Sequence, residues 1–160
     1  MKITVYHGGT EVVVNPICGF GRKNLDFGQG FYLTEIEEQA VQMARRTAAI
    51  YGGEPVVTAF GFDEVAAMAD GALSVKRFAE PNEEWALFVM ANRSREGAHP
   101  VHDYDIVIGP VADDTIATLF RNFEDGIIDL PMLVAGLRYK KVSSQYLFHS
   151  ACAVQYLEIL

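Results

Sequence analysis

A long glycine-rich segment near the amino terminus constrains this sequence more than any other feature. Between Gly8 and Gly30 the chain carries six glycines and a proline, too many for a regular helix or strand. Lys2–His7 alternates polar and apolar residues and favours a strand, and Phe31–Leu33 favours a second, short strand. We therefore predict a long loop between two strands. Long ordered loops are uncommon in compact domains and are often functional.

The remaining sequence predicts helices and strands that do not alternate regularly. Thr34 followed by Glu37 is a capping-box pattern that predicts a helix start, and Gly52 with Gly53 predicts its end. Further strands are expected at 55–62, 73–78, 104–108, 145–149 and 155–160, and further helices at 82–95, from 113 and at 130–137. Such a mixture favours an α+β fold over a doubly wound sheet. No repeat or linker divides the chain, so residues 1–160 are predicted to form a single domain.

The composition is typical of a compact domain with a net negative charge. Half of the residues are hydrophobic, and the formal net charge is −8 at pH 7. This charge repels polyphosphate at long range and argues against a general nucleic-acid-binding module. The longest apolar run, Trp85–Ala91, is too short to cross a membrane, and no signal-length apolar segment follows Met1. We therefore expect a cytoplasmic protein without membrane contact, in which Cys18 and Cys152 are free thiols.

Three short segments point to one kind of chemistry. They are Tyr6–Gly8 (YHG) at the end of the first strand, Gly28–Tyr32 (GQGFY) before a helix, and Ser144–Phe148 (SQYLF) near the carboxyl terminus. In this order they resemble the His-Tyr-Glu signature of the diphtheria-toxin-like ADP-ribosyltransferases, the branch that includes the poly(ADP-ribose) polymerases. The chain is more closely similar to a small bacterial family of uncharacterised proteins in that superfamily, some of them encoded beside a predicted antitoxin. The shared pattern is YHG, DFGxGFY, EWxxFVxxNR, YDIVIGPVADD and QYxFH, in this order over nearly the full length.

The resemblance implies an ADP-ribosyltransferase-like split β-sandwich with flanking helices and a cleft that holds NAD. His7 would bind the adenine-side ribose, the Gly8 backbone would bind the nicotinamide carboxamide, and Tyr32 would stack on the nicotinamide ring. The residue types suit these roles, because imidazole both donates and accepts, glycine permits close backbone approach, and tyrosine offers a flat face. Phe31 is a further expected NAD-binding residue. Arg22 in the glycine-rich loop is placed to meet the pyrophosphate, although exposed loop charge is commonly just solvated.

The sequence departs from the signature at the catalytic glutamate, whose place is taken by Gln145. Glutamine can accept a hydrogen bond from a ribose hydroxyl, but it has no charge and takes no proton from the acceptor. Loss of one preorganised electrostatic contact costs about 10²- to 10³-fold in rate, which slows a transferase without necessarily abolishing it. Asp26, Asp113 and Asp114 are candidate replacements for the missing acid. The last two also fit the ordinary N-cap and first turn of a helix.

Several of these residues have structural alternatives. His7 at a strand end can be a structural hydrogen-bonding residue, and GxGFY can be a tight turn before a buried strand. Their register with Gln145 favours a site instead. Asn92 and Arg93 close a predicted helix, where an amide and a cation suit the carboxyl end, so a structural role is favoured over phosphate binding.

Two other polar groups are weaker candidates. Arg138, Lys140 and Lys141 form a compact positive cluster that could attract an anionic acceptor, although a solvated charge run is the ordinary explanation. His99–Asp103 imitates a metal-binding pattern, but Pro100 breaks any helix and no third histidine or cysteine is near. We therefore expect no metal.

Two hypotheses for the function follow. The first is an NAD-dependent ADP-ribosyltransferase with His7, Tyr32 and Gln145 at its centre, a toxin-like effector that uses NAD as substrate and modifies a protein or nucleic acid. If the pattern of the resembling family holds, a cognate antitoxin binds it. The second is a catalytically degenerate transferase fold that binds NAD, ADP-ribose or a partner protein, and Gln145 favours it. Hydrolysis of NAD without an acceptor is an intermediate option.

Overall fold

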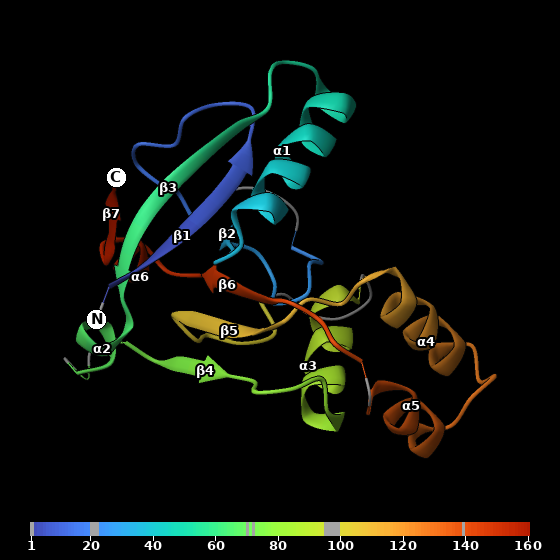
Figure 1. The fold of residues 1–160 in the computed structure, drawn as a ribbon. Coiled ribbons are helices and arrows are strands. Elements are labelled where there is room, and N and C mark those ends of the chain that lie inside the picture. The colour runs from blue at the N-terminus through green and yellow to red at the C-terminus, as the bar shows by residue number, and fades with distance from the viewer. Residues whose placement is uncertain (1, 20–22, 70, 72, 95–99, 139) are drawn as a thin grey trace.

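The computed structural model describes residues 2–19, 23–69, 71, 73–94, 100–138 and 140–160, and the statements below concern these residues. Two β-sheets and the helices packed against them form the fold (Figure 1). The fold class is therefore α+β, as predicted from the irregular order of strands and helices. In the part of the chain described here, none of the helices has the length and apolar character needed to span a membrane.

The first sheet contains three antiparallel strands. They are β1 (Lys2–Gly9), β3 (Val56–Asp63) and β7 (Leu157–Ile159), in the order β1-β3-β7. The helix α1 (Glu37–Tyr51) packs beside β1 and β3 (Figure 1). The end of β1, which carries His7, therefore lies next to this helix.

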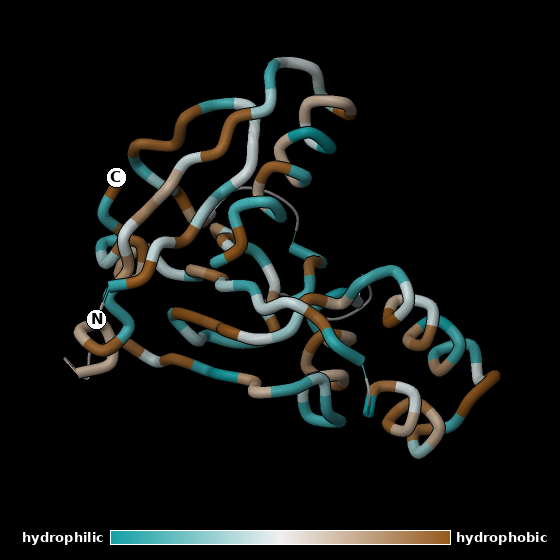
Figure 2. Tube along the Cα trace, in the orientation of Figure 1, coloured by the Kyte–Doolittle hydropathy of each residue, from teal (hydrophilic) through white to brown (hydrophobic). Residues whose placement is uncertain are grey.

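The second sheet contains four strands in the order β2-β6-β5-β4. They are β2 (Phe31–Leu33), β6 (Ser144–Phe148), β5 (Ile106–Pro110) and β4 (Val75–Arg77), and only the β4–β5 pair is parallel. All five residues of β5 are buried, which explains its hydrophobic sequence (Figure 2). A strand that is covered on both faces is expected to be apolar along its length rather than alternating.

The two sheets are joined by an isolated bridge between Tyr6 of β1 and Thr34, which follows β2. The Tyr6 N–H donates to the Thr34 carbonyl at 2.7 Å, and the Thr34 N–H donates to the Tyr6 carbonyl at 3.0 Å. Because β1 and β2 meet at this bridge, His7 and Tyr32 lie close to the junction of the two sheets.

Five further helices follow α1 in the described part of the chain. They are α2 (Glu64–Ala69), α3 (Glu83–Arg93), α4 (Asp114–Glu124), α5 (Leu130–Leu137) and α6 (Ala151–Val154). The short helices α2 and α6 are absent from the predicted elements, because segments of this length carry too little periodic pattern to recognise.

Two hydrophobic cores lie on opposite faces of the second sheet. The core between the sheets includes Val5 of β1 and Phe148 of β6. The core between the second sheet and the helices α3, α4 and α5 includes Leu147 of β6 and Trp85 of α3. Successive strand residues point to opposite faces, so a single strand such as β6 contributes to both cores.

The predicted starts of α3 and α4 are confirmed. Asn82 accepts a hydrogen bond from the Trp85 N–H at 3.0 Å, and Asp113 accepts one from the Ile116 N–H at 2.9 Å. Both are side-chain N-caps of the kind that asparagine and aspartate commonly provide.

The predicted capping box at Thr34 is wrong. The helix α1 begins at Glu37, and Ile36 stands at its N-cap without a side-chain cap. Thr34 instead accepts from the Ile36 N–H at 3.1 Å and donates to the Gln39 side chain at 3.0 Å. The bridge to Tyr6 keeps Thr34 extended, so it lies two positions too early to cap the helix.

Candidate functional site

The end of the glycine-rich loop, residues 25–30, is fixed by side chains from elsewhere in the chain, and we call it the anchored turn. The Tyr32 hydroxyl accepts a hydrogen bond from the Phe27 N–H at 3.1 Å and donates one to the Gly28 carbonyl. Burial raises the pKa of this hydroxyl, so it keeps the proton that it donates. Gly28 has a φ of +88°, a conformation that glycine adopts readily. Tyr32 therefore fixes the turn that precedes its own strand.

Two histidines hold the same turn from other elements. Nε2 of His102 lies 2.6 Å from the Phe27 carbonyl oxygen, and Nδ1 of His149 lies 2.6 Å from the Gln29 carbonyl oxygen. A carbonyl only accepts, so each of these nitrogens carries a hydrogen. Nδ1 of His102 accepts from the Tyr104 N–H at 3.1 Å, and desolvation by burial lowers the pKa of His102. No local pattern in the sequence predicts this arrangement, because the two histidines are 75 and 120 positions away from their partners in the turn.

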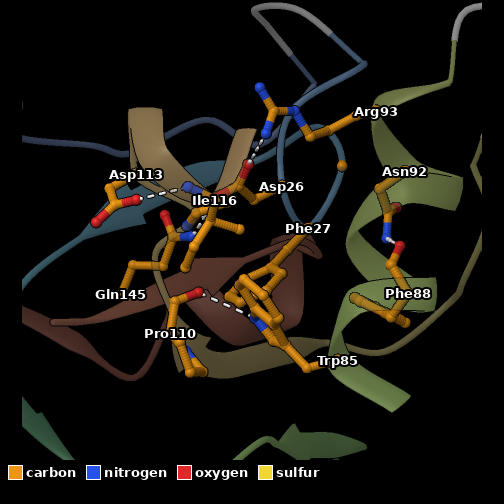
Figure 3. A network of polar contacts seen from close by, with 12 residues as sticks. Asp26, Phe27, Trp85, Phe88, Asn92, Arg93, Pro110, Asp113, Ile116 and Gln145 are labelled. Atoms are coloured by element: carbon orange, nitrogen blue, oxygen red, sulfur yellow. Dashed lines mark hydrogen bonds and ion pairs between the residues drawn. The ribbon is translucent and has the colours of Figure 1, made fainter. Parts of the chain in front are cut away.

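Asp26 and Gln145 are hydrogen-bonded to each other (Figure 3). Nε2 of Gln145 donates to Oδ2 of Asp26 at 3.0 Å, and the Ala112 N–H donates to the same oxygen at 3.0 Å. Nη1 of Arg93 lies 3.7 Å from the other carboxylate oxygen, and the Asp26 side chain is only 16% exposed. Burial raises the pKa of the Asp26 carboxyl, and its bonds with Ala112 and Gln145 and the charge of Arg93 oppose that effect. The residue in the glutamate position thus borders a buried acid.

His7 lies near the end of β1 with one ring nitrogen occupied. Nδ1 of His7 is 3.0 Å from the Tyr32 carbonyl oxygen, so Nδ1 carries the hydrogen and Nε2 is left as an acceptor. The ring stacks on Phe31, with centroids 4.3 Å apart. Burial lowers the pKa of His7 more than the bond to Tyr32 raises it, so the ring is neutral at pH 7. His7 is therefore prepared to accept a hydrogen bond.

The predicted site residues lie on two faces of the second sheet. Phe31 belongs to the core between the sheets, whereas Tyr32 packs against the core beneath α3–α5. Gln145 shares a face with Leu147 of the latter core. Tyr32 and Gln145 thus meet around the anchored turn. His7 stacks on Phe31 and approaches the edge strand β2 from the opposite face.

Close packing explains two of the expected NAD-binding residues without a ligand. A Cβ at Gly8 would lie 2.0 Å from the Ala40 carbonyl oxygen, so glycine is required where β1 meets α1. Phe31 is buried between the sheets, edge-on to Phe60. Arg22 lies outside the described residues.

The other candidate acids have structural roles at α4. Asp113 is the N-cap of this helix and Asp114 lies in its first turn. Within the described residues, neither makes a hydrogen bond to Gln145. Asn92, at the end of α3, is fully buried and donates to the Phe88 carbonyl at 2.8 Å. Asp113 therefore has the predicted N-cap role, whereas Asn92 bonds back within α3 and Ser94 is the C-cap of that helix.

A pocket of about 370 Å³ opens beside the anchored turn. It is lined by Pro16, Ile17, Cys18, Gly19, Gln29, His149, Ala151 and Val154. The Cys18 thiol donates to the carbonyls of Phe148 and Ser150, at 3.1 and 3.3 Å. Cys18 and Cys152 are both free thiols, as predicted. The first part of the glycine-rich loop thus covers the end of β6.

The weaker candidates do not assemble into a site in the part of the chain that is described. No group of three or more histidine, cysteine or acidic side chains there could hold a metal ion, and His99 lies outside that part. Of the positive cluster, Arg138 and Lys141 are exposed, and Lys140 borders a hollow of about 520 Å³ near α4 and α5.

Fold and site together define a two-sheet α+β protein with an anchored turn at the sheet junction. A family model described as "Protein of unknown function (DUF3990)" matches residues 3–159, and the chain belongs to this family. Comparisons with curated proteins and with solved structures found no match. The family description names no activity, so the resemblance to ADP-ribosyltransferases stays a prediction.

Proposed function

We propose that this protein is an NAD-dependent ADP-ribosyltransferase that modifies a protein or nucleic acid. The supporting observation is the meeting of three segments that are distant in sequence: the end of β1, the anchored turn with β2, and β6. Hydrogen bonds from His7 to the Tyr32 carbonyl and from Gln145 to Asp26 join them. These are the segments that carry the His-Tyr-Glu-like pattern, and a site built from that pattern requires them to converge.

The finer fold that we propose is an ADP-ribosyltransferase-like split β-sandwich. The isolated bridge between Tyr6 and Thr34 supports it, because β1 pairs there with the residue that follows β2, and the two strands belong to separate sheets. A split of this kind leaves strand ends at the junction available to a ligand.

In the proposed reaction, the bond between C1′ of the ribose and the nicotinamide nitrogen breaks, and its electron pair leaves with nicotinamide. A lone pair of the acceptor then forms a new bond to C1′, and the acceptor's proton goes to solvent. His7 and Gln145 would orient the two riboses, because Nε2 of His7 and Oε1 of Gln145 are acceptors suited to hydroxyl groups. Such orientation accelerates a reaction by holding its groups in a productive geometry.

The proposal is tested by calorimetric titration with NAD, together with nicotinamide release measured in the presence and absence of cell lysate. We expect NAD binding and a release that depends on the lysate, because the lysate supplies the macromolecular acceptor. The absence of binding at millimolar NAD would overturn the proposal. Release by the pure protein would identify NAD hydrolysis without an acceptor.

Variants test the assignment of the site residues. His7→Ala and Tyr32→Ala are expected to abolish the modification, and circular dichroism checks that each variant is folded. Tyr51→Ala is the matched control, because Tyr51 is 81% exposed at the end of α1. Full activity in both site variants would defeat the assignment.

A catalytically degenerate fold that binds NAD, ADP-ribose or a partner protein is the second candidate. Two observations favour it. The Tyr32 hydroxyl is occupied by the anchored turn. His7 approaches the second sheet on the Phe31 face, whereas Gln145 of β6 lies on the opposite face of that sheet, with Leu147. One NAD molecule would have to pass the edge of β2 to reach both residues. Binding of NAD without any nicotinamide release would support this function over the first.

A cognate antitoxin is the protein partner that we propose from the family resemblance. Co-expression of this chain with the product of a neighbouring gene, followed by purification on a tag, tests the idea. A stable complex is expected, and recovery of this chain alone would count against the partner.

A further inference from the structure

Asp26 is the one carboxylate hydrogen-bonded to Gln145 within the described residues. Its Oδ2 accepts from both Gln145 and the Ala112 N–H, and its Oδ1 faces Arg93. The carboxylate is therefore fixed by contacts to β6, to the residue before the α4 N-cap, and to the end of α3 (Figure 3).

This contact fixes which way the Gln145 amide points. A carboxylate accepts hydrogen bonds and does not donate them, so the NH₂ group of Gln145 must face Asp26. The carbonyl oxygen Oε1 then points away from Asp26. In the part of the chain that is described, no donor is bonded to this oxygen. Gln145 is thereby oriented as a hydrogen-bond acceptor.

We propose that Asp26 is the positioning residue of the transferase site: it holds the Gln145 amide with Oε1 toward the ribose and supplies the negative charge that glutamine lacks. This inference rests on the proposed function. The proposed arrangement differs from a simple loss of the catalytic glutamate. The negative charge is kept on Asp26, which is one hydrogen bond further from the ribose than Gln145.

Geometry and electrostatics support a site in which Gln145 accepts the hydrogen bond and Asp26 supplies the charge. A charge in a water-poor environment acts more strongly on a developing cation than the same charge in water. Asp26 is largely buried, and its carboxylate interacts electrostatically with Arg93 and with Tyr32. The charge of Arg93 and the hydrogen bonds from Ala112 and Gln145 favour the ionised carboxylate and oppose the rise in pKa that burial causes.

The first test compares Asp26→Asn with Asp129→Asn. Asp26→Asn keeps an acceptor for the Ala112 N–H but removes the charge, so we expect kcat for nicotinamide release to fall about tenfold or more with little change in KM. Asp129, the N-cap of α5, is a matched control, because asparagine caps a helix equally well. Unchanged kcat in Asp26→Asn would overturn the inference.

The second test is Gln145→Glu, which separates a positioned glutamine from a lost glutamate. Two carboxylates at this distance cannot both ionise easily, so one takes up a proton. We expect lower activity than the wild type at pH 7, and a partial recovery in the double variant Asp26→Asn/Gln145→Glu. Higher activity of Gln145→Glu at pH 7 would overturn the inference, and so would a double variant no better than the worse single one.

A third readout does not depend on NAD. The side-chain NH₂ resonances of Gln145 are expected to titrate with the Asp26 carboxyl in the wild type and to lose this titration in Asp26→Asn. Resonances that are insensitive to Asp26 would overturn the inference even in an active enzyme. Titrating resonances in a wild type that leaves NAD intact would instead reject the proposed function while supporting the contact.

Discussion

The two parts of the glycine-rich loop differ sharply in how they are held. In the first part, Val12, Val14 and Ile17 are 61–63% exposed, and the described contacts are few. In the anchored turn, Phe27 is fully buried, and its N–H and carbonyl groups are both bonded to side chains. Glycine content alone therefore does not determine how firmly a loop is held. The side chains that contact the loop determine it.

The largest expected difference between the two parts is in buried apolar area. Phe27→Ala removes a ring from the core beneath α3–α5 and should lower the free energy of unfolding by about 3–5 kcal/mol. Ile17→Ala, in the exposed part, should change it by less than about 0.5 kcal/mol. Urea denaturation measures both. Equal effects would mean that the anchored turn is no better packed than the rest of the loop.

Two glycines of the same loop sharpen the comparison. A Cβ at Gly30 would lie 2.7 Å from the Phe148 carbonyl oxygen, whereas a Cβ at Gly19 would meet none of the described residues within 4 Å. Gly30→Ala should therefore destabilise the protein by about 1–3 kcal/mol. Gly19→Ala should be neutral or slightly stabilising. Thermal denaturation of the two variants measures the difference, and a neutral Gly30→Ala would show that β2 and β6 can separate at no cost.

Tyr32→Phe isolates the hydrogen bonds of the anchored turn from its packing. The variant keeps the ring but leaves the Phe27 N–H and the Gly28 carbonyl without their partner, at a cost on the order of 1 kcal/mol. Hydrogen exchange of the Phe27 amide should become faster. Unchanged exchange would mean that other contacts alone hold the turn.

The smallest expected effect is the response to mild acid. Burial lowers the pKa of His7 and of His102 below the ordinary value of 6.5. The unfolded chain therefore binds more protons than the folded one below that pH. The contribution of the two neutral histidines to the free energy of unfolding is therefore complete above pH 6.5. It is lost as the pH falls toward their pKa values in the folded protein.

Urea midpoints at about pH 7.5 and about pH 5.5 measure this loss. The raised pKa of Asp26 acts in the opposite direction, between the ordinary value of 3.8 and its folded value. His102→Asn should reduce the dependence, because one of the two histidines no longer titrates. A midpoint that does not fall on acidification would contradict the assignment of neutral, buried rings.

The sequence predicted the elements of the fold well, because most carry local signals. The strand at 31–33 and the caps at Asn82 and Asp113 are in their predicted places. Thr34 misled the prediction, because a capping-box pattern says nothing about the bridge that keeps this residue extended.

The site was predictable only in part. Asp26 was one of three candidate acids, and the helix-start pattern set Asp113 and Asp114 apart from it. No local signal predicted the contact between Asp26 and Gln145, because it spans 119 positions in sequence. The roles of His102 and His149 depend on the same kind of long-range contact. Motif order predicts which segments belong together, but not which side chains meet.

The anchored turn also sets an order of events during synthesis. Its residues leave the ribosome well before its partners Gln145 and His149, which belong to the last strand of the second sheet in sequence and to the residue after it. Contacts of such long sequence separation form late, because a large loop must close first. A nascent chain that stops before Ser144 therefore has no assembled site. Whatever chemistry the site performs therefore begins only after β6 has been made and has folded against the anchored turn.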